Sequence, residues 1–143
     1  MRWWILILAF LAGCAQQPPL PVDAPCAVTP TVTRVFNNHS LIGKEDRDIF
    51  VYPLSDRTLR TQANGGPEKL LVFLARLPTP LPSSIAVTGE NLRTGTRLAF
   101  VAERHASEFG TEWGTNFSFP DAGCWQLSVS EGGNQGRIVV EVR

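Results

Sequence analysis

The sequence predicts an all-β fold, and more narrowly a single antiparallel β-sandwich of immunoglobulin-like type with six to eight strands. Two observations predict it. From Cys26 onward, short runs of β-branched and aromatic residues are separated by clusters of Gly, Asn, Asp and Pro, a pattern typical of strands and turns. These runs follow one another closely, which favours a sandwich, with a small barrel as the alternative.

Eight runs are candidate strands, each chosen for its β-forming residues and the turn residues beside it. A polar loop through Asn37, Asn38 and His39 is expected after the first run. Gly132-Gly133-Asn134 predicts a hairpin between the last two runs. The runs are Thr31 to Phe36, Asp48 to Tyr52, Lys69 to Ala75, Ile85 to Thr88, Arg97 to Ala102, Trp113 to Phe119, Cys124 to Ser130 and Gly136 to Val142.

Two of these runs predict how they are buried. Residues 70–74 are continuously apolar, which indicates a central strand covered on both faces. Successive side chains of a strand point to opposite faces, so the run that begins at Trp113 places Trp113, Phe117 and Phe119 on one face. We expect that face to line the core.

The first 14 residues have the composition of an export signal. Arg2 is followed by an apolar run over 3–12 and then by Gly13-Cys14. Ten helical residues rise about 15 Å, roughly half the hydrocarbon thickness of a bilayer, so this run is too short to span a membrane. Leu11-Ala12-Gly13-Cys14 resembles the lipobox of bacterial lipoproteins. The resemblance implies that a diacylglyceryl group is attached to the thiol of Cys14, that the chain is then cleaved before Cys14, and that the mature protein carries fatty acyl chains such as palmitate.

This assignment divides the chain into a signal peptide over 1–13, a lipidated N-terminus and Pro-rich linker over 14–25, and a β-sandwich domain over 26–143. The prolines of the linker favour an extended tether of about 3 Å per residue. The lipid is the expected attachment to a membrane. The resemblance implies an envelope location, and Ala15 in place of Asp implies the outer membrane if the source has two membranes.

The two remaining cysteines, Cys26 and Cys124, are expected to form a disulfide, because an exported domain meets an oxidising compartment. In the run Cys124 to Ser130, Trp125, Leu127 and Val129 share the apolar face, so Cys124 either points the other way or lies at the start of the strand. The bridge is therefore expected to clamp the N-terminal segment onto the outside of the sheet. A redox or metal role has little support, since neither cysteine has a second thiol or a histidine close by in sequence.

The sequence offers little catalytic chemistry. His39 and His105 are the candidate bases, and each is expected in a polar loop. The serines lack a Gly-x-Ser-x-Gly nucleophile elbow. Three carboxylates within 45–48 could offer oxygens to calcium, but the rest of a calcium loop is missing. We therefore expect no enzyme, no metal and no cofactor.

The aromatic residues leave a second interpretation open. Exposed tryptophans can stack on sugars, so Trp113 and Trp125 are candidate ligand-facing aromatics, although their strand faces favour the core. The segment 119–127 resembles the F-P-x-x-G-C-W closing motif of small bacterial cell-envelope β-sandwich proteins. That resemblance implies an exported β domain with a disulfide and a core tryptophan, and it implies no catalytic residue.

The sequence as a whole predicts a non-enzymatic, membrane-anchored envelope lipoprotein that binds a protein partner or supports an envelope assembly. The alternative is a carbohydrate-binding module. The 13 basic and 13 acidic residues are not gathered into blocks, so nucleic acid is not an expected partner. The sequence predicts no oligomeric state.

Overall fold

A computed structural model describes residues 21, 24–53 and 59–143 of the chain. This part is built of antiparallel strands with one helical turn, α1 (Gln62–Gly65), so the predicted all-β class is confirmed. The strands are β1 (Thr31–Phe36), β2 (His39–Asp46), β3 (Ile49–Pro53), β4 (Glu68–Leu74), β5 (Ser84–Asn91), β6 (Arg97–Ser107), β7 (Gly110–Phe117), β8 (Gly123–Glu131) and β9 (Asn134–Val142). In the described residues, no helix is long and apolar enough to cross a membrane.

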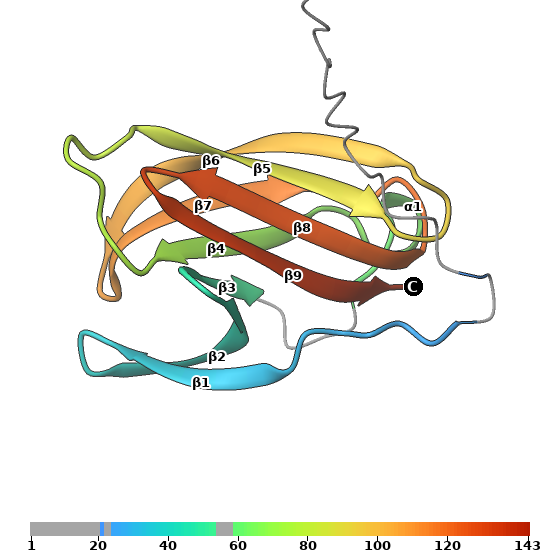
Figure 1. Cartoon of the computed structure of the whole chain (residues 1–143), viewed down its shortest axis with the longest axis horizontal. Coiled ribbons are helices and arrows are strands. Elements are labelled where there is room, and N and C mark those ends of the chain that lie inside the picture. The colour runs from blue at the N-terminus through green and yellow to red at the C-terminus, as the bar shows by residue number, and fades with distance from the viewer. Residues whose placement is uncertain (1–20, 22–23, 54–58) are drawn as a thin grey trace, which may run out of the picture.

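One continuous sheet forms the two layers of the sandwich (Figure 1). Its strand order is β1-β2-β3-β4-β7-β6-β5-β8-β9. β6 makes the corner between the layers, because residues 97–103 pair with β5 and residues 103–107 pair with β7. The sheet thereby folds on itself, and β9 returns to the neighbourhood of β2 and β3.

The main core lies between the two layers. Trp113, Phe119 and Trp125 are its largest side chains, and all three are fully buried. The predicted core faces are confirmed, since Phe117, Leu127 and Val129 are buried in the same core. Strand alternation, which is local, is sufficient to place these side chains.

A second, smaller core lies on the other face of β3 and β4, where the β1–β2 hairpin covers them. We call this hairpin the arm. Leu41 of the arm is buried with Phe50, Leu71 and Phe73, and Phe36 of β1 stacks on Phe73 with ring centroids 4.3 Å apart. β4 is therefore buried on both faces, as its continuous apolar run predicts.

The predicted polar loop through His39 is wrong, because His39–Asp46 form the strand β2. This strand brings the total in the described residues to nine, one more than the six to eight expected. Asn37 and Asn38 both have positive φ, 45° and 69°, which is the backbone of a type I′ hairpin turn. His39 therefore begins β2, directly opposite Phe36. The polar residues of β2 hide its strand character because only Leu41 and Gly43 are buried along it.

The segment that resembles an envelope closing motif forms a compact corner before β8. The indole N–H of Trp125 donates to the carbonyl oxygen of Asp121 at 2.9 Å, and the Trp125 ring lies against Phe119 with centroids 5.4 Å apart. Gly123 has a φ of +135°, and a Cβ there would lie 2.9 Å from the amide of the buried Asn91. Both the conformation and the close approach favour glycine at this position.

Candidate functional site

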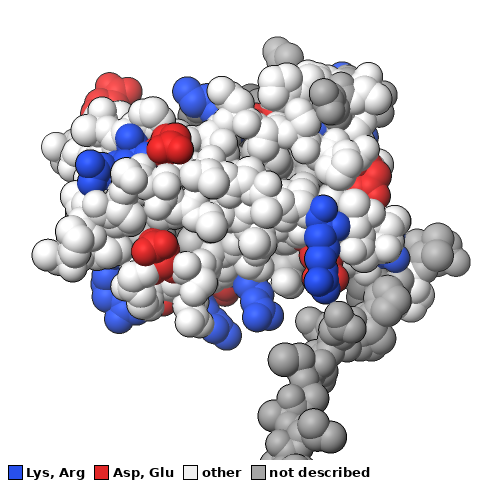
Figure 2. Space-filling view, turned by 90° about the horizontal axis from the view of Figure 1, so that it is seen from above, with Lys and Arg blue, Asp and Glu red and all other residues white. Residues whose placement is uncertain are grey.

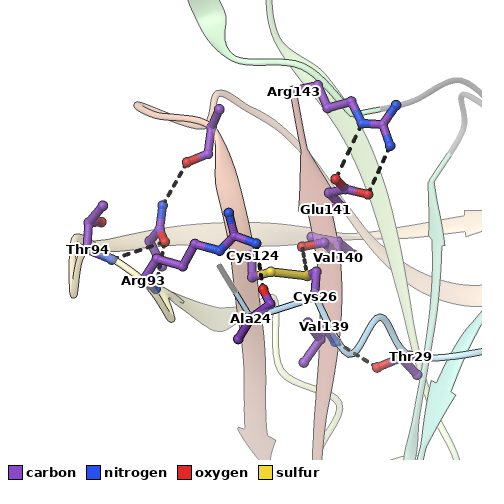
Figure 3. Close-up of a disulfide and its surroundings, with 12 residues drawn as sticks. Ala24, Cys26, Thr29, Arg93, Thr94, Cys124, Val139, Val140, Glu141 and Arg143 are labelled. Carbon is purple, nitrogen blue, oxygen red and sulfur yellow. Dashed lines mark hydrogen bonds and ion pairs between the residues drawn. A yellow bond between two sulfur atoms is a disulfide. The ribbon is translucent and has the colours of Figure 1, made fainter. Parts of the chain in front are cut away.

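The predicted disulfide is present and lies where strand alternation places it (Figure 3). Cys26 and Cys124 are bonded, with Cα atoms 5.6 Å apart, and Cys124 faces away from the core that holds Trp125. The guanidinium of Arg93 donates to the carbonyl oxygen of Ala24 at 2.8 Å, beside the bridge. The N-terminal segment is thus fixed to the outside of β8 and β9. Cys14, the predicted lipidation site, lies outside the described residues, so lipidation stays a prediction.

Trp113 and Trp125, the candidate ligand-facing aromatics of the alternative interpretation, are both 0% exposed, which is the core position that their strand faces favour. Each indole N–H is satisfied inside the protein: Trp113 donates to the carbonyl oxygen of Pro82 at 3.3 Å, and Trp125 donates to that of Asp121. Their strands turn these residues toward the opposite layer. Neither ring is available to stack on a sugar, so the carbohydrate-binding alternative loses the feature that motivated it.

Both histidines are exposed and lie in strands, so their predicted place in loops is wrong. His39 starts β2 and makes an edge-on contact with Phe109, with ring centroids 5.5 Å apart. His105 lies in β6 opposite Glu112. The hydroxyl of Ser107 donates directly to the Glu112 carboxylate at 2.9 Å. A serine-histidine-carboxylate relay needs the imidazole between the other two groups, and this arrangement does not provide it.

The carboxylates of 45–48 are each engaged by the protein. Glu45 forms an ion pair with Arg34. Asp46 accepts a hydrogen bond from the backbone N–H of Arg137 at 2.7 Å, and Asp48 forms an ion pair with Arg76 at 3.2 Å. Among the described residues, no group of three or more His, Cys, Asp or Glu side chains could hold a metal ion.

A small cavity of about 230 Å³ lies at the seam between β9 and β3. Its walls are core side chains such as Val51 and Ile138, and Lys44, Glu141 and Arg143 reach its rim. Burial lowers the pKa of the Lys44 ammonium, whose hydrogen bond goes to the carbonyl oxygen of Thr29 at 2.6 Å. The volume is below the range of about 300–1,000 Å³ usual for small-molecule sites, so we do not base a function on it.

The two end strands of the sheet, β1 and β9, differ in whether hydrogen bonds satisfy the backbone groups on their outer edges. In β9, the odd-numbered residues direct their backbone groups away from β8, because Glu131 and Asn134 flank the two-residue turn. The carbonyl oxygen of Gln135 accepts from the N–H of Asp48 at 3.2 Å, and the N–H of Arg137 donates to the Asp46 carboxylate. The backbone of Val139 makes two hydrogen bonds with Thr29, at 3.0 and 2.7 Å. Just after β9, the N–H of Arg143 donates to the carbonyl oxygen of Leu59 at 2.9 Å, and its carbonyl oxygen accepts from the N–H of Thr61 at 3.1 Å. The edge of β9 is thus largely sealed.

The outer edge of β1, at the bottom of Figure 1, is open. The two-residue turn makes Phe36 and His39 a hydrogen-bonded pair, so Thr31, Thr33 and Val35 direct their N–H and C=O groups away from β2. No residue in the described ranges bonds to these six groups. We call this row of backbone groups the open edge. The run Thr31–Phe36 has no internal proline or bulge, which are two of the devices with which proteins block an exposed edge. Its one charged residue, Arg34, is on the face opposite Val35 and forms an ion pair with Glu45.

The arm also exposes apolar side chains beside the open edge. Val35 is 66% exposed and Ile42 is 62% exposed. Thr33 lies directly opposite Ile42 in the register, so Thr33, Val35 and Ile42 share the outer face of the arm. The sequence pattern alone does not single out these three residues. Asn37-Asn38 between two candidate strands was the available signal, because two residues that tolerate positive φ predict a tight hairpin.

Two other surface features lie on β6. Residues 97–102 pair with β5 along one edge, and their other edge has no strand partner within the described residues, with Val101 52% exposed beside it. An open hollow of about 510 Å³ lies over β5, β6 and β8. On the face shown in Figure 2, Lys, Arg, Asp and Glu lie singly and both signs are mixed over a mostly uncharged surface. No protein-family model matches the chain, and no curated protein or solved structure matches it either. We take the open edge of β1 as the candidate site, because Val35 and Ile42 beside it are the most exposed of the large apolar side chains in the described residues. A row of outward backbone groups has the geometry that pairs with an extended polypeptide.

Proposed function

We propose that this chain is a lipid-anchored envelope protein of non-enzymatic type, and that its domain binds a protein partner by pairing with a strand at the open edge of β1. The observation that carries the proposal is the contrast between the two end strands. Several separate segments seal β9, whereas six backbone groups of β1 have no partner within the described residues. An incoming strand would satisfy them, as in other cases of β-strand addition.

The proposed address rests on the sequence. The apolar run over 3–12, the lipobox-like Leu11-Ala12-Gly13-Cys14 and the Pro-rich linker form a consistent series of signal, anchor and tether. The disulfide supports an exported location, because such bridges persist in oxidising compartments. A tether attached before residue 26 would leave the arm free to meet a partner in the envelope.

The experiment is photo-crosslinking in native membranes. The full-length chain carries the photoreactive residue benzoylphenylalanine in place of Val35, and a matched chain carries it in place of Val101, which is 52% exposed on β6. We expect a protein adduct at position 35 that is absent at position 101. Thr33→Pro in the chain labelled at 35 should remove the adduct, because it deletes an outward N–H that the hairpin does not use.

Two outcomes would contradict the proposal. Equal labelling at positions 35 and 101, or an adduct that survives Thr33→Pro, would mean that the open edge is not the binding site. Mass analysis of the N-terminal peptide from the same membranes tests the address, since we expect it to begin at Cys14 and to carry acyl mass. An N-terminal peptide without lipid would overturn the anchor while leaving the edge hypothesis to the crosslinks.

A further inference from the structure

The strand that pairs with the open edge of β1 can be named, provided that the proposed function holds. We propose that the open edge pairs with the same edge of a second copy of this chain, β1 against β1, antiparallel, about a two-fold axis at Thr33. A two-fold interface uses one surface patch on both subunits, so the patch must complement itself. The backbone, the charges and the apolar side chains of β1 each meet that requirement in one register.

The backbone groups match in that register. Thr31, Thr33 and Val35 are the residues whose N–H and C=O groups point outward. With Thr33 opposite Thr33 of the second copy, Thr31 lies opposite the second copy's Val35, and Val35 lies opposite its Thr31. Each of these three pairs exchanges two hydrogen bonds, so all six outward groups of each copy gain a partner. The two sheets would join into one continuous sheet.

The charge on β1 favours this register over the two registers that are shifted by two residues. Arg34 is the charged residue of β1, and it points to the face opposite that of Thr33 and Val35. In the proposed register Arg34 lies opposite Val32 of the second copy. A shift of two residues in one direction would put Arg34 directly opposite Arg34, and like charges at that position are destabilising. A shift in the other direction would leave Val35 beyond the paired residues.

The apolar side chains of the arm gain cover in the same arrangement. Val35, which is 66% exposed, would lie beside the methyl-bearing side chains of Thr31 and Thr33 of the second copy. Ile42 neighbours Thr33 within each arm, so the two Thr33 side chains at the axis would lie between the two isoleucines. Arg34 keeps its ion pair with Glu45 of its own copy and lies opposite the uncharged Val32 of the second copy, so joining the arms in this register brings no two Arg34 side chains into direct opposition.

Cysteine crosslinking of the full-length chain in detergent tests the register. Residues that form a hydrogen-bonded antiparallel pair have Cα atoms about 5.5 Å apart, within disulfide range. Oxidation of Thr33→Cys should therefore yield a covalent dimer on a non-reducing gel. Val35→Cys is the matched control, since the two copies of residue 35 would be offset by about 14 Å along the strands. It should form a dimer only when mixed with Thr31→Cys.

Sedimentation of the chain without added cysteines tests the association itself. We expect a dimer that Thr33→Pro converts to monomer. Val35→Lys, a change at an exposed position, should have the same effect, because lysine on an edge opposes further pairing. Unaltered circular dichroism of Val35→Lys would show that the fold persists.

The outcomes separate the two proposals. A monomeric chain whose position 35 still crosslinks to another protein in native membranes would overturn self-pairing and leave the proposed function standing. A dimer that persists in Val35→Lys, or that crosslinks equally through Val35→Cys alone, would place the interface elsewhere and overturn the inference. A monomer with no adduct at position 35 would overturn both.

Discussion

Removal of the Cys26–Cys124 disulfide should destabilise the domain severely. The change is the double variant Cys26→Ala with Cys124→Ala, which leaves no unpaired thiol at either position. The cysteines are 98 residues apart in sequence, so the bridge closes a loop that spans most of the domain. The chain-entropy relation gives about 4.7 kcal/mol for a loop of about 100 residues. Domains of this kind are stable by about 5–15 kcal/mol, so the loss is a large share of the total.

Urea unfolding followed by tryptophan fluorescence measures this loss, because Trp113 and Trp125 are fully buried and become exposed on unfolding. With a slope of about 1–3 kcal/mol per molar urea, a loss of 4–5 kcal/mol moves the midpoint by more than about 1 M. The unaltered chain with a reductant should unfold at the midpoint of the double variant. Equal midpoints for the oxidised chain and the double variant would refute the loop-closure reasoning.

Two further substitutions test how the domain is held together away from the bridge. Asn134 is fully buried and makes three hydrogen bonds, two with the backbone of Arg76 (2.9 and 2.8 Å) and one with the carbonyl oxygen of Glu131 (3.1 Å). Asn134→Ala should therefore cost about 2–4 kcal/mol by leaving buried groups unpaired, measured as a lower urea midpoint. A Cβ on Gly136 would clash with the backbone carbonyl oxygen of Asp46 and with the side chain of Ile49, so Gly136→Ala should cost about 1–3 kcal/mol by overpacking. An unchanged thermal midpoint would contradict that close approach.

The features that the sequence predicts correctly are those set by neighbouring residues. The continuous run 70–74 is buried on both faces, and the alternation after Trp113 and Cys124 assigns the correct side of each strand. Period-two alternation is enough for this, because a one-residue shift would move the apolar residues to the wrong face. The disulfide was predicted from the cysteine count and the export signal, and alternation then put the bridge on the outside.

The features that the sequence does not predict depend on which strands become neighbours. β2 reads as a loop because His39-Ser40 and the polar residues 44–46 surround its buried positions, and its burial depends on the arm curling over Phe50 and Phe73. The open edge depends on β1 being the end strand, which follows from the order of the whole sheet. A period-two pattern does not distinguish an end strand from an inner one when both have one polar face.

The sealed edge and the open edge are linked through one short segment. The disulfide and the hydrogen bonds of Thr29 fix residues 26–29 along β9, and β1 begins at Thr31, only two residues later. The segment that seals Val139 therefore also sets where β1 starts. If the bridge is reduced, Val139 is held by Thr29 without the covalent support of Cys26, and the edge of β9 becomes easier to expose. The change would be confined to Val139, because Gln135, Arg137 and Arg143 are bonded to residues outside the bridged segment. The bridge and Thr29 thus close the middle of the β9 edge, while Asp46, Asp48 and Leu59 close the rest, so that of the two end strands β1 is the one left open.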